Sequence, residues 1–255
     1  MPLVSAQMMD NPLTSPPPSR LRLSEGRRVY VVGDVHGHRD QLEQVHRTIR
    51  ADLAERPVPE PFLVHLGDLI DRGPDSAGCL DLLADGDPVD GVPTVNLLGN
   101  HEWMMLKALD PDSFDDVDRW LDNGGDRTLR SWGLRSAMTA AEWRAGIPER
   151  HLDFLRTLRP SWNLDQYVFV HAGVRPGVRM DEQREMDLLW IRDSFLNWTG
   201  PMLPEQPNTV VVHGHTPAPE PELRSNRIGL DTGAGKGGPL TCAVLEGNGL
   251  GLFQH

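Results

Sequence analysis

The sequence has little cysteine, no long apolar run and no excess of positive charge, and each absence excludes a class of protein. The two cysteines, Cys79 and Cys242, lie far apart and form no metal-spaced pair, so we expect reduced thiols in a cytoplasmic protein. No apolar stretch approaches the length of a membrane span, and residues 1–20 lack the pattern of a signal peptide. The net charge of −12 argues against a non-specific hold on nucleic acid.

Length and composition indicate a globular chain. The 255 residues are 38% hydrophobic and 24% charged, which suits one large domain or two small ones. Residues 1–26 include Pro12 and three consecutive prolines at 16–18, a pattern that predicts a loose N-terminal arm. We expect a single domain over residues 27–255.

One seven-residue stretch directs the functional interpretation: Gly67-Asp68-Leu69-Ile70-Asp71-Arg72-Gly73. It follows an apolar run at 62–66 that predicts a buried strand. The first glycine permits a tight turn. Asp68 can bind a cation, and Arg72 can hold a phosphate or a carboxylate in a two-pronged contact. A charged loop after a strand is by itself a common structural feature.

Two further predicted strands end in the same way. The strand at 27–32 runs into Gly33-Asp34-Val35-His36-Gly37, and the strand at 92–98 runs into Gly99-Asn100-His101-Glu102. Helical stretches lie between them, beginning near Asp40 and near Ala77, with another over 103–109. Connections of this kind make the strands parallel, and the carboxyl ends of parallel strands meet at one edge of the sheet. The three loops should therefore converge.

The second half of the chain adds histidines. Residues 110–159 are polar with interspersed tryptophans, including Trp120, and predict a helical insertion whose aromatic side chains belong to the core. Predicted strands at 167–170 and 209–212 end in His171 and in His213-Gly214-His215. The stretches 227–230, 240–245 and 250–253 predict antiparallel strands with glycine-rich turns.

Together these loop residues suffice for two divalent cations that share one carboxylate. A central aspartate suits the bridging position between two ions about 3.5–4 Å apart. The mixture of imidazole nitrogen with Asp and Asn oxygen fits manganese, iron or zinc better than calcium or magnesium. With two such ions and Arg72 the site would be locally positive inside an acidic protein. A phosphate group is the natural ligand, and His213 and His215 are both open as ligands.

In this order the motifs resemble the signature of the calcineurin-like metallophosphoesterases. The Asp-Arg-Gly and Gly-Asn-His-Glu forms are similar to the phosphoprotein phosphatase branch, which includes bacterial serine/threonine phosphatases and symmetrical diadenosine tetraphosphatases. The motifs span Gly33 to Pro217, most of the chain. The resemblance implies an α/β fold, a sandwich of two mixed β-sheets flanked by helices (α/β/β/α) with a helical insertion.

The resemblance also implies roles for individual residues. A first metal would be held by Asp34, His36 and Asp68, and a second by Asp68, Asn100, His171 and His215, the last in preference to His213. The ions would most simply be manganese, with iron or zinc as alternatives, and a hydroxide bridging them would attack phosphorus. The catalytic set would be His101 as general acid, Asp71 as its orienting partner, and Arg72 and Arg192. Arg72, Arg192 and Asn100 would bind substrate.

Three functions follow from this resemblance. The first is a phosphatase acting on phosphorylated Ser/Thr side chains, with tolerance for phosphotyrosine. The second is a symmetrical diadenosine tetraphosphate hydrolase, which shares every catalytic residue with the first. The third is a non-catalytic, metal-dependent binding module, which the presence of His101, Asp71 and Arg72 disfavours. We favour the protein phosphatase, with a phosphorylated protein or small molecule as partner and no role for nucleic acid or membrane.

Overall fold

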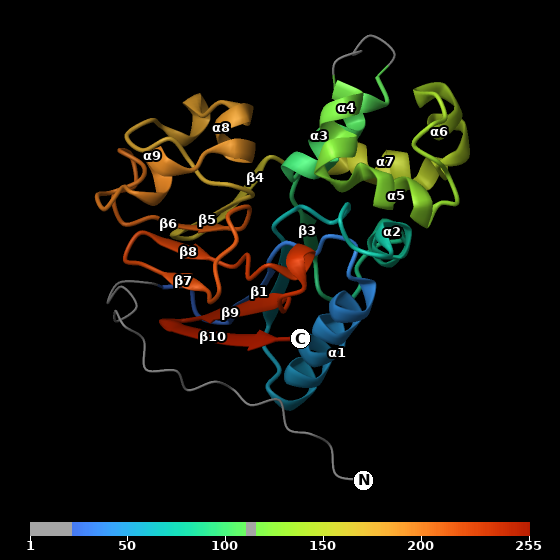
Figure 1. Ribbon diagram of the computed structural model, residues 1–255. Helices are drawn as coiled ribbons and strands as arrows, with labels where there is room; N and C mark the ends of the chain where they lie inside the picture. The colour runs from blue at the N-terminus through green and yellow to red at the C-terminus, as the bar shows by residue number, and fades with distance from the viewer. Residues whose placement is uncertain (1–21, 111–115) are drawn as a thin grey trace.

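The computed structural model describes residues 22–110 and 116–255. Its strands form two mixed five-stranded sheets (Figure 1), one ordered β10-β9-β1-β2-β3 and the other β4-β5-β6-β8-β7. The strands of the first sheet are β1 Arg27–Val32, β2 Glu60–His65, β3 Thr94–Asn96, β9 Thr241–Glu246 and β10 Gly249–Gln254. Those of the second are β4 Ser161–Leu164, β5 Tyr167–Val170, β6 Val210–His213, β7 Glu222–Leu223 and β8 Arg227–Gly229.

Helices cover the outer face of each sheet (Figure 1). α8 and α9 lie over the second sheet, and the remaining helices gather beside the first. The helices are α1 Arg39–Glu55, α2 Ser76–Ala84, α3 Asn100–Ala108, α4 Asp116–Trp120, α5 Asp126–Ser131, α6 Ala140–Gly146, α7 Glu149–Thr157, α8 Glu185–Trp190 and α9 Asp193–Leu196. The predicted helical insertion is thus α4 to α7. None of the helices in the described part of the chain is long and apolar enough to cross a bilayer.

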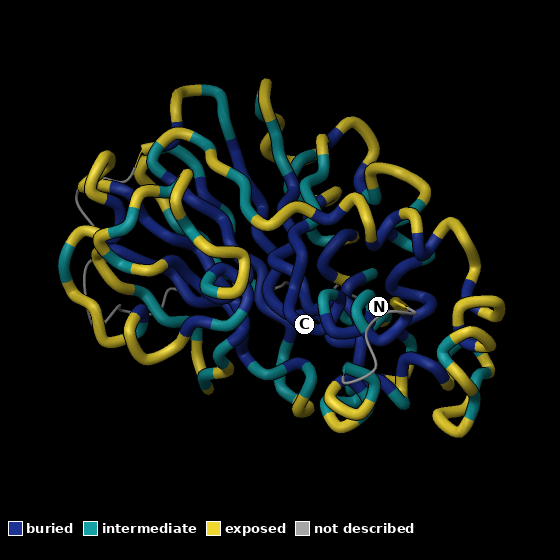
Figure 2. Tube along the Cα trace, turned by 90° about the horizontal axis from the view of Figure 1, so that it is seen from above, coloured by how far each residue is buried: buried dark blue, intermediate teal, exposed yellow. Residues whose placement is uncertain are grey.

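Alternation along the strands builds three apolar layers. In β1, Val29 and Val31 point between the two sheets, where they pack with Phe169 of β5 and Val212 of β6. Tyr30 of β1 faces the other way, into the core under the helices. Since successive side chains of a strand point to opposite faces, one strand serves two layers. Figure 2 shows these buried strands at the centre, with exposed segments around the rim. The α/β/β/α sandwich is confirmed.

The parallel strands point their carboxyl ends to one side of the molecule. β1 pairs in parallel with β2, and β2 with β3. In the second sheet β5 pairs in parallel with β6, and β6 with β8. The prediction that the segment 227–230 is antiparallel was wrong with respect to β6, because the strand returns beside β6 after a crossover. It is antiparallel only to the short β7, while the β9–β10 hairpin is antiparallel as predicted.

The first described residues contact turns of both sheets. Most of the predicted N-terminal arm, residues 1–21, lies outside the described residues. Leu23 is buried, and its N–H donates to the Gly247 carbonyl at 2.9 Å. Ser24 N–H donates to Asp165 Oδ2 at 2.8 Å. Residues 23 and 24, which were predicted to belong to the arm, are thus held by an apolar side chain and two hydrogen bonds to the β9–β10 and β4–β5 turns.

Candidate active site

The loops at the carboxyl ends of the strands meet, and they bring the predicted ligands into one buried cluster. The backbone N–H groups of Val35 and His36 donate to the Asp68 carbonyl at 3.0 and 2.7 Å, and Gly214 N–H donates to the His171 carbonyl at 2.8 Å. These bonds join neighbouring loops within each sheet, and the His215 N–H, which donates to Asp34 Oδ2 at 3.0 Å, joins the two sheets. The side chains gathered in this way are all at most 6% exposed, namely Asp34, His36, Asp68, Asn100, His171 and His215.

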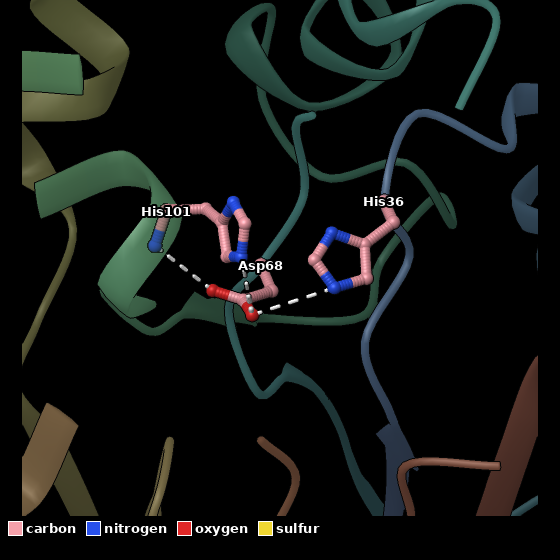
Figure 3. Close-up of side chains that lie close together, drawn as sticks. All are labelled: His36, Asp68 and His101. Atoms are coloured by element: carbon pink, nitrogen blue, oxygen red, sulfur yellow. Dashed lines mark hydrogen bonds and ion pairs between the residues drawn. The ribbon is translucent and has the colours of Figure 1, made fainter. Parts of the chain in front are cut away.

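Asp68 lies at the centre of two sets of possible metal ligands. One set is Asp68, His36 and His101 (Figure 3), and the other is Asp68, His171 and His215; in each set the ligand atoms lie within 4.8 Å of one another. Burial alone would raise the pKa of Asp68, but the neighbouring imidazoles, of which His171 has the largest effect, hold this pKa below its ordinary value. An ionised carboxylate between two groups of imidazoles can serve both.

The tautomers of His36 and His171 are fixed by backbone carbonyls. His36 Nδ1 lies 3.0 Å from the Ile70 carbonyl, and His171 Nδ1 lies 2.9 Å from the Leu66 carbonyl. A carbonyl only accepts, so each Nδ1 carries the proton and each Nε2 presents a lone pair. These Nε2 atoms face Asp68 at 3.5 and 3.3 Å. Lone pairs directed at carboxylate oxygens are a donor set that fits a cation.

Burial keeps these rings neutral. It lowers the pKa of His36 to about 3 and also lowers that of His171. For His215 burial lowers the pKa to about 2. Metal ligation requires neutral imidazole. The residues present therefore fit the divalent ions that the signature implies.

An amide lies beside the second set. Asn100 Oδ1 lies 2.9 Å from His171 Nε2 and 2.8 Å from His215 Nδ1. The other nitrogen of His215 accepts from Arg192 Nε at 3.1 Å, which places the second predicted phosphate-binding arginine beside this set. His213 lies apart from both sets. Its Nδ1 contacts the Gly214 carbonyl, and its Nε2 has no hydrogen-bond partner among the described residues.

Asp34 occupies a different position from the other predicted ligands. It belongs to neither set of converging ligand atoms, and its carboxylate accepts the His215 backbone N–H at 3.0 Å. Burial, together with the carboxylates of Asp231 and Asp68, raises the pKa of Asp34 well above its ordinary value. Asp231 is itself only 6% exposed. The assignment of Asp34 to the first metal stays a prediction.

The predicted acid and its partner form a close pair beside the first set. His101 Nδ1 lies 2.6 Å from Asp71 Oδ2, and both side chains are buried. Burial opposes a charge on His101, but the carboxylates of Asp68 and Asp71 raise its pKa above the ordinary value for histidine. The fork of Arg72 spans the site, with NH1 at 2.7 Å from His36 Nε2 and NH2 at 2.8 Å from His101 Nε2.

Glu102, to which the sequence gave no role, joins two of the loops. Its Oε1 accepts the N–H groups of Leu69 and Ile70 at 2.6 and 3.2 Å. Its Oε2 accepts those of Asp68 and Gly99 at 2.9 Å each. The signal was present, because Glu102 is the third residue of α3, where a capping glutamate bonds back to the preceding turn. Four donors on one buried carboxylate fix the loop carrying Asp68 to the start of α3.

Backbone strain is concentrated in these loops. The described residues other than glycine with positive φ are Asp165 and five predicted site residues: His36 at 46°, Asp68 at 50°, Asp71 at 72°, Arg72 at 65° and His215 at 66°. A left-handed residue with a side chain costs about 1–3 kcal/mol and persists only where its surroundings hold it. Gly67 precedes this run because a Cβ there would lie 2.5 Å from the Gly99 nitrogen.

Comparisons with known proteins agree with this geometry. A family model described as calcineurin-like phosphoesterase matches residues 27–250. The chain is 33% identical to serine/threonine-protein phosphatase 1 of Salmonella typhimurium, over 89% of this chain and 96% of that protein. It is 28% identical to the symmetrical bis(5'-nucleosyl)-tetraphosphatase of Nitrosospira multiformis, over 86% and 92%. The crystal structure of a protein assigned as a diadenosine tetraphosphatase superposes with a TM-score of 0.61 at 25% identity, covering 93% of this chain and 95% of that one.

Proposed function

The chain belongs to the calcineurin-like phosphoesterase family and is a metal-dependent phosphoester hydrolase, and we propose that its substrates are phosphorylated serine and threonine side chains. The observation that carries this proposal is the pairing of the Arg72 fork with the His101–Asp71 dyad beside the shared carboxylate. Such a site binds a phosphoryl group and supplies a proton to an alkoxide. The 33% identity to a protein phosphatase, over nearly the whole of both chains, favours the protein substrate.

We assign the ligands of the two ions as the sequence motifs place them. Asp34, His36 and Asp68 would hold the first ion, and Asp68 would be shared with the second. The remaining ligands of the second ion would be Asn100, His171 and His215. When bound, two such ions act as Lewis acids and lower the pKa of a water molecule into the neutral range. We propose manganese as the metal, because the donors mix nitrogen and oxygen.

The protein's own residues supply binding and proton transfer. Arg72 donates to both His36 Nε2 and His101 Nε2, so a phosphoryl group that takes up the Arg72 fork frees both nitrogens. Arg192 would hold a second phosphoryl oxygen, and together the arginines offset the charge of a loose phosphoryl-transfer transition state. Once a phosphoryl group has engaged Arg72, His101 Nε2 can take up a proton from solvent, and as the phosphorus–oxygen bond breaks His101 passes this proton to the leaving oxygen. The Nδ1 proton stays on the ring and is donated to Asp71, which stabilises the imidazolium.

We also propose a cytoplasmic location, because Cys79 and Cys242 are both free, buried thiols. Burial raises the pKa of both thiols above the usual range. They are therefore unreactive side chains of the core, and neither lies among the site residues. No covalent enzyme intermediate is needed.

The decisive experiment compares kcat/KM for a phosphoserine peptide and for diadenosine tetraphosphate, with manganese and one enzyme preparation. We expect the peptide to be preferred. Preference for the dinucleotide would replace the proposal with the symmetrical tetraphosphatase, the activity named for the relative from Nitrosospira multiformis. Turnover of neither substrate by metal-loaded protein would indicate a binding module.

Metal stoichiometry tests the shared ligand separately. Asp68 is the member common to both ligand sets, so Asp68→Asn should lower the tightly bound manganese from two ions per chain to at most one. Mass spectrometry of metal content after gel filtration measures this. Two ions held tightly by the variant would contradict the bridging assignment.

A further inference from the structure

The helical insertion reaches the catalytic dyad directly. Thr128 of α5 donates from Oγ1 to Asp71 Oδ1 at 2.6 Å. Trp120 of α4 donates from Nε1 to both oxygens of the same carboxylate, at 3.1 and 3.0 Å. Both side chains are fully buried. The sequence indicated a core role for Trp120, and its ring does pack against Trp143, but its N–H is used at the active site.

Both the proton and the oxygen of the Thr128 hydroxyl take part in hydrogen bonds. Its oxygen accepts the Asp71 backbone N–H at 2.8 Å and lies 2.9 Å from Ser76 Oγ. Its single proton goes to the carboxylate, which only accepts, so Ser76 must donate to Thr128. Ser76 Oγ also accepts the Asp71 N–H at 3.0 Å. The backbone and the carboxylate of Asp71 are thus both fixed by one threonine.

The turn between α4 and α5 contacts Arg72, the residue that follows Asp71. Leu121–Gly125 joins α4 to α5 through a kink at Gly124, whose backbone dihedral angles are not helical. Within it Gly124 has φ 104° and its carbonyl lies 3.4 Å from Arg72 N. A Cβ at Gly124 would come within 3.0 Å of Arg72 Cγ. Asp71 and Arg72 both have positive φ, so the insertion contacts the two strained residues whose side chains serve catalysis.

We propose that Thr128 and Trp120 are positioning residues for proton transfer to the leaving group, a role that rests on the proposed function. Thr128 holds Asp71 Oδ1 and Trp120 bridges both oxygens, and in this orientation Oδ2 also accepts His101 Nδ1 at 2.6 Å. With Oδ2 in place, His101 Nε2 points to Arg72 and to the ligand cluster. Without the two donors, Asp71 is free to rotate, and His101 loses the partner that sets its orientation.

The test separates proton transfer from general damage by changing the leaving group. Thr128→Val removes the hydroxyl at nearly constant volume, and Thr128→Ser restores it. With manganese, Thr128→Val should lower kcat on a phosphoserine peptide by about 10- to 100-fold, a part of the 10²–10⁴ that general acid catalysis contributes. Turnover of p-nitrophenyl phosphate, whose leaving group needs no proton, should change less than about 3-fold. Thr128→Ser should behave like the native protein on both substrates.

Trp120→Phe should show the same selective loss in smaller degree. Its matched control is Trp132→Phe, which removes an indole hydrogen bond to His151 Nδ1 elsewhere in the insertion and should leave the ratio of the two substrates unchanged. Equal losses on both substrates, or no loss from Thr128→Val, would overturn the positioning role.

A spectroscopic readout makes the result independent of turnover. In protein with ¹⁵N-labelled histidine, the short bond to Asp71 should place the His101 Nδ1 proton far downfield, and Thr128→Val should move or broaden this resonance. Thr128→Ser and Trp132→Phe should leave it in place. An unchanged resonance in Thr128→Val would refute the positioning role, whatever the turnover. Failure of the native protein to hydrolyse either substrate would refute only the proposed function.

Discussion

Replacement of Glu102 by glutamine should destabilise the protein far more than its conservative chemistry suggests. In whichever orientation the amide settles, its NH2 group faces two of the four backbone N–H groups that the carboxylate now accepts. Each buried donor left without a partner costs about 1–3 kcal/mol, so we expect a loss of about 2–6 kcal/mol. For a chain of this size a loss of this kind lowers the Tm by at least roughly 4 °C.

The assay is urea unfolding of the metal-free protein, followed by circular dichroism, with Glu142→Gln as a matched control. Glu142 caps α6 as Glu102 caps α3, and it accepts Thr139 N–H at 2.7 Å, but it is exposed. The control should lose less than about 1 kcal/mol, because water replaces the lost bond. A loss of that small size in Glu102→Gln would refute the reasoning. Manganese affinity should fall in the same variant, because the loops carrying Asp68 and Asn100 are no longer joined.

Three further predictions concern histidines. His101→Asn should keep its metal but lose about 10²–10⁴-fold in kcat on a phosphoserine peptide and much less on p-nitrophenyl phosphate; equal losses would contradict the acid role. His215→Ala should lower activity and manganese binding more than His213→Ala, since only His215 lies in a ligand set, and the reverse order would show that the wrong histidine was chosen. Burial lowers the pKa of His65 to about 4, so its contribution to stability is present above about pH 6.5 and is lost as the pH falls toward 4. Between about pH 4 and pH 6.5, the unfolding free energy of His65→Gln should depend on pH less steeply than that of the native protein, by up to about 1.4 kcal/mol per pH unit. Urea unfolding at several pH values measures this slope. A slope equal to that of the native protein would count against the lowered pKa of His65.

Local patterns predicted the convergence of the loops because each motif closes a strand. The apolar runs before Gly33, Gly67 and Gly99 fix three neighbouring strands, and parallel pairing then brings the loops after them to one edge. Convergence of Asp68 with His36 and Asn100 therefore needed no knowledge of the rest of the fold. The same reasoning placed His171 and His215 at strand ends, but only the family resemblance predicted that a second sheet would bring them to the first.

Features that depend on distant partners were missed. Nothing near Arg227 in the sequence specifies that β8 pairs with β6, because strand direction depends on the length and path of the crossover. Trp120 and Thr128 look like ordinary residues of amphipathic helices. Their bonds to Asp71 join positions 49 and 57 residues apart, a separation at which spacing carries no signal.

The pairing of β1 has a consequence for how the protein is made. β1 lies between β2 and β9, and the N–H of Gly33, which opens the Asp34 loop, donates to the Thr241 carbonyl at 3.0 Å. During synthesis β1 therefore waits with an open edge until the segment at 241–246 has left the ribosome. A chain arrested before that point presents an unpaired apolar strand edge, and it is a substrate for chaperones and proteases. The loop that carries Asp34 gains its hydrogen bond to Thr241 only when β9 is in place.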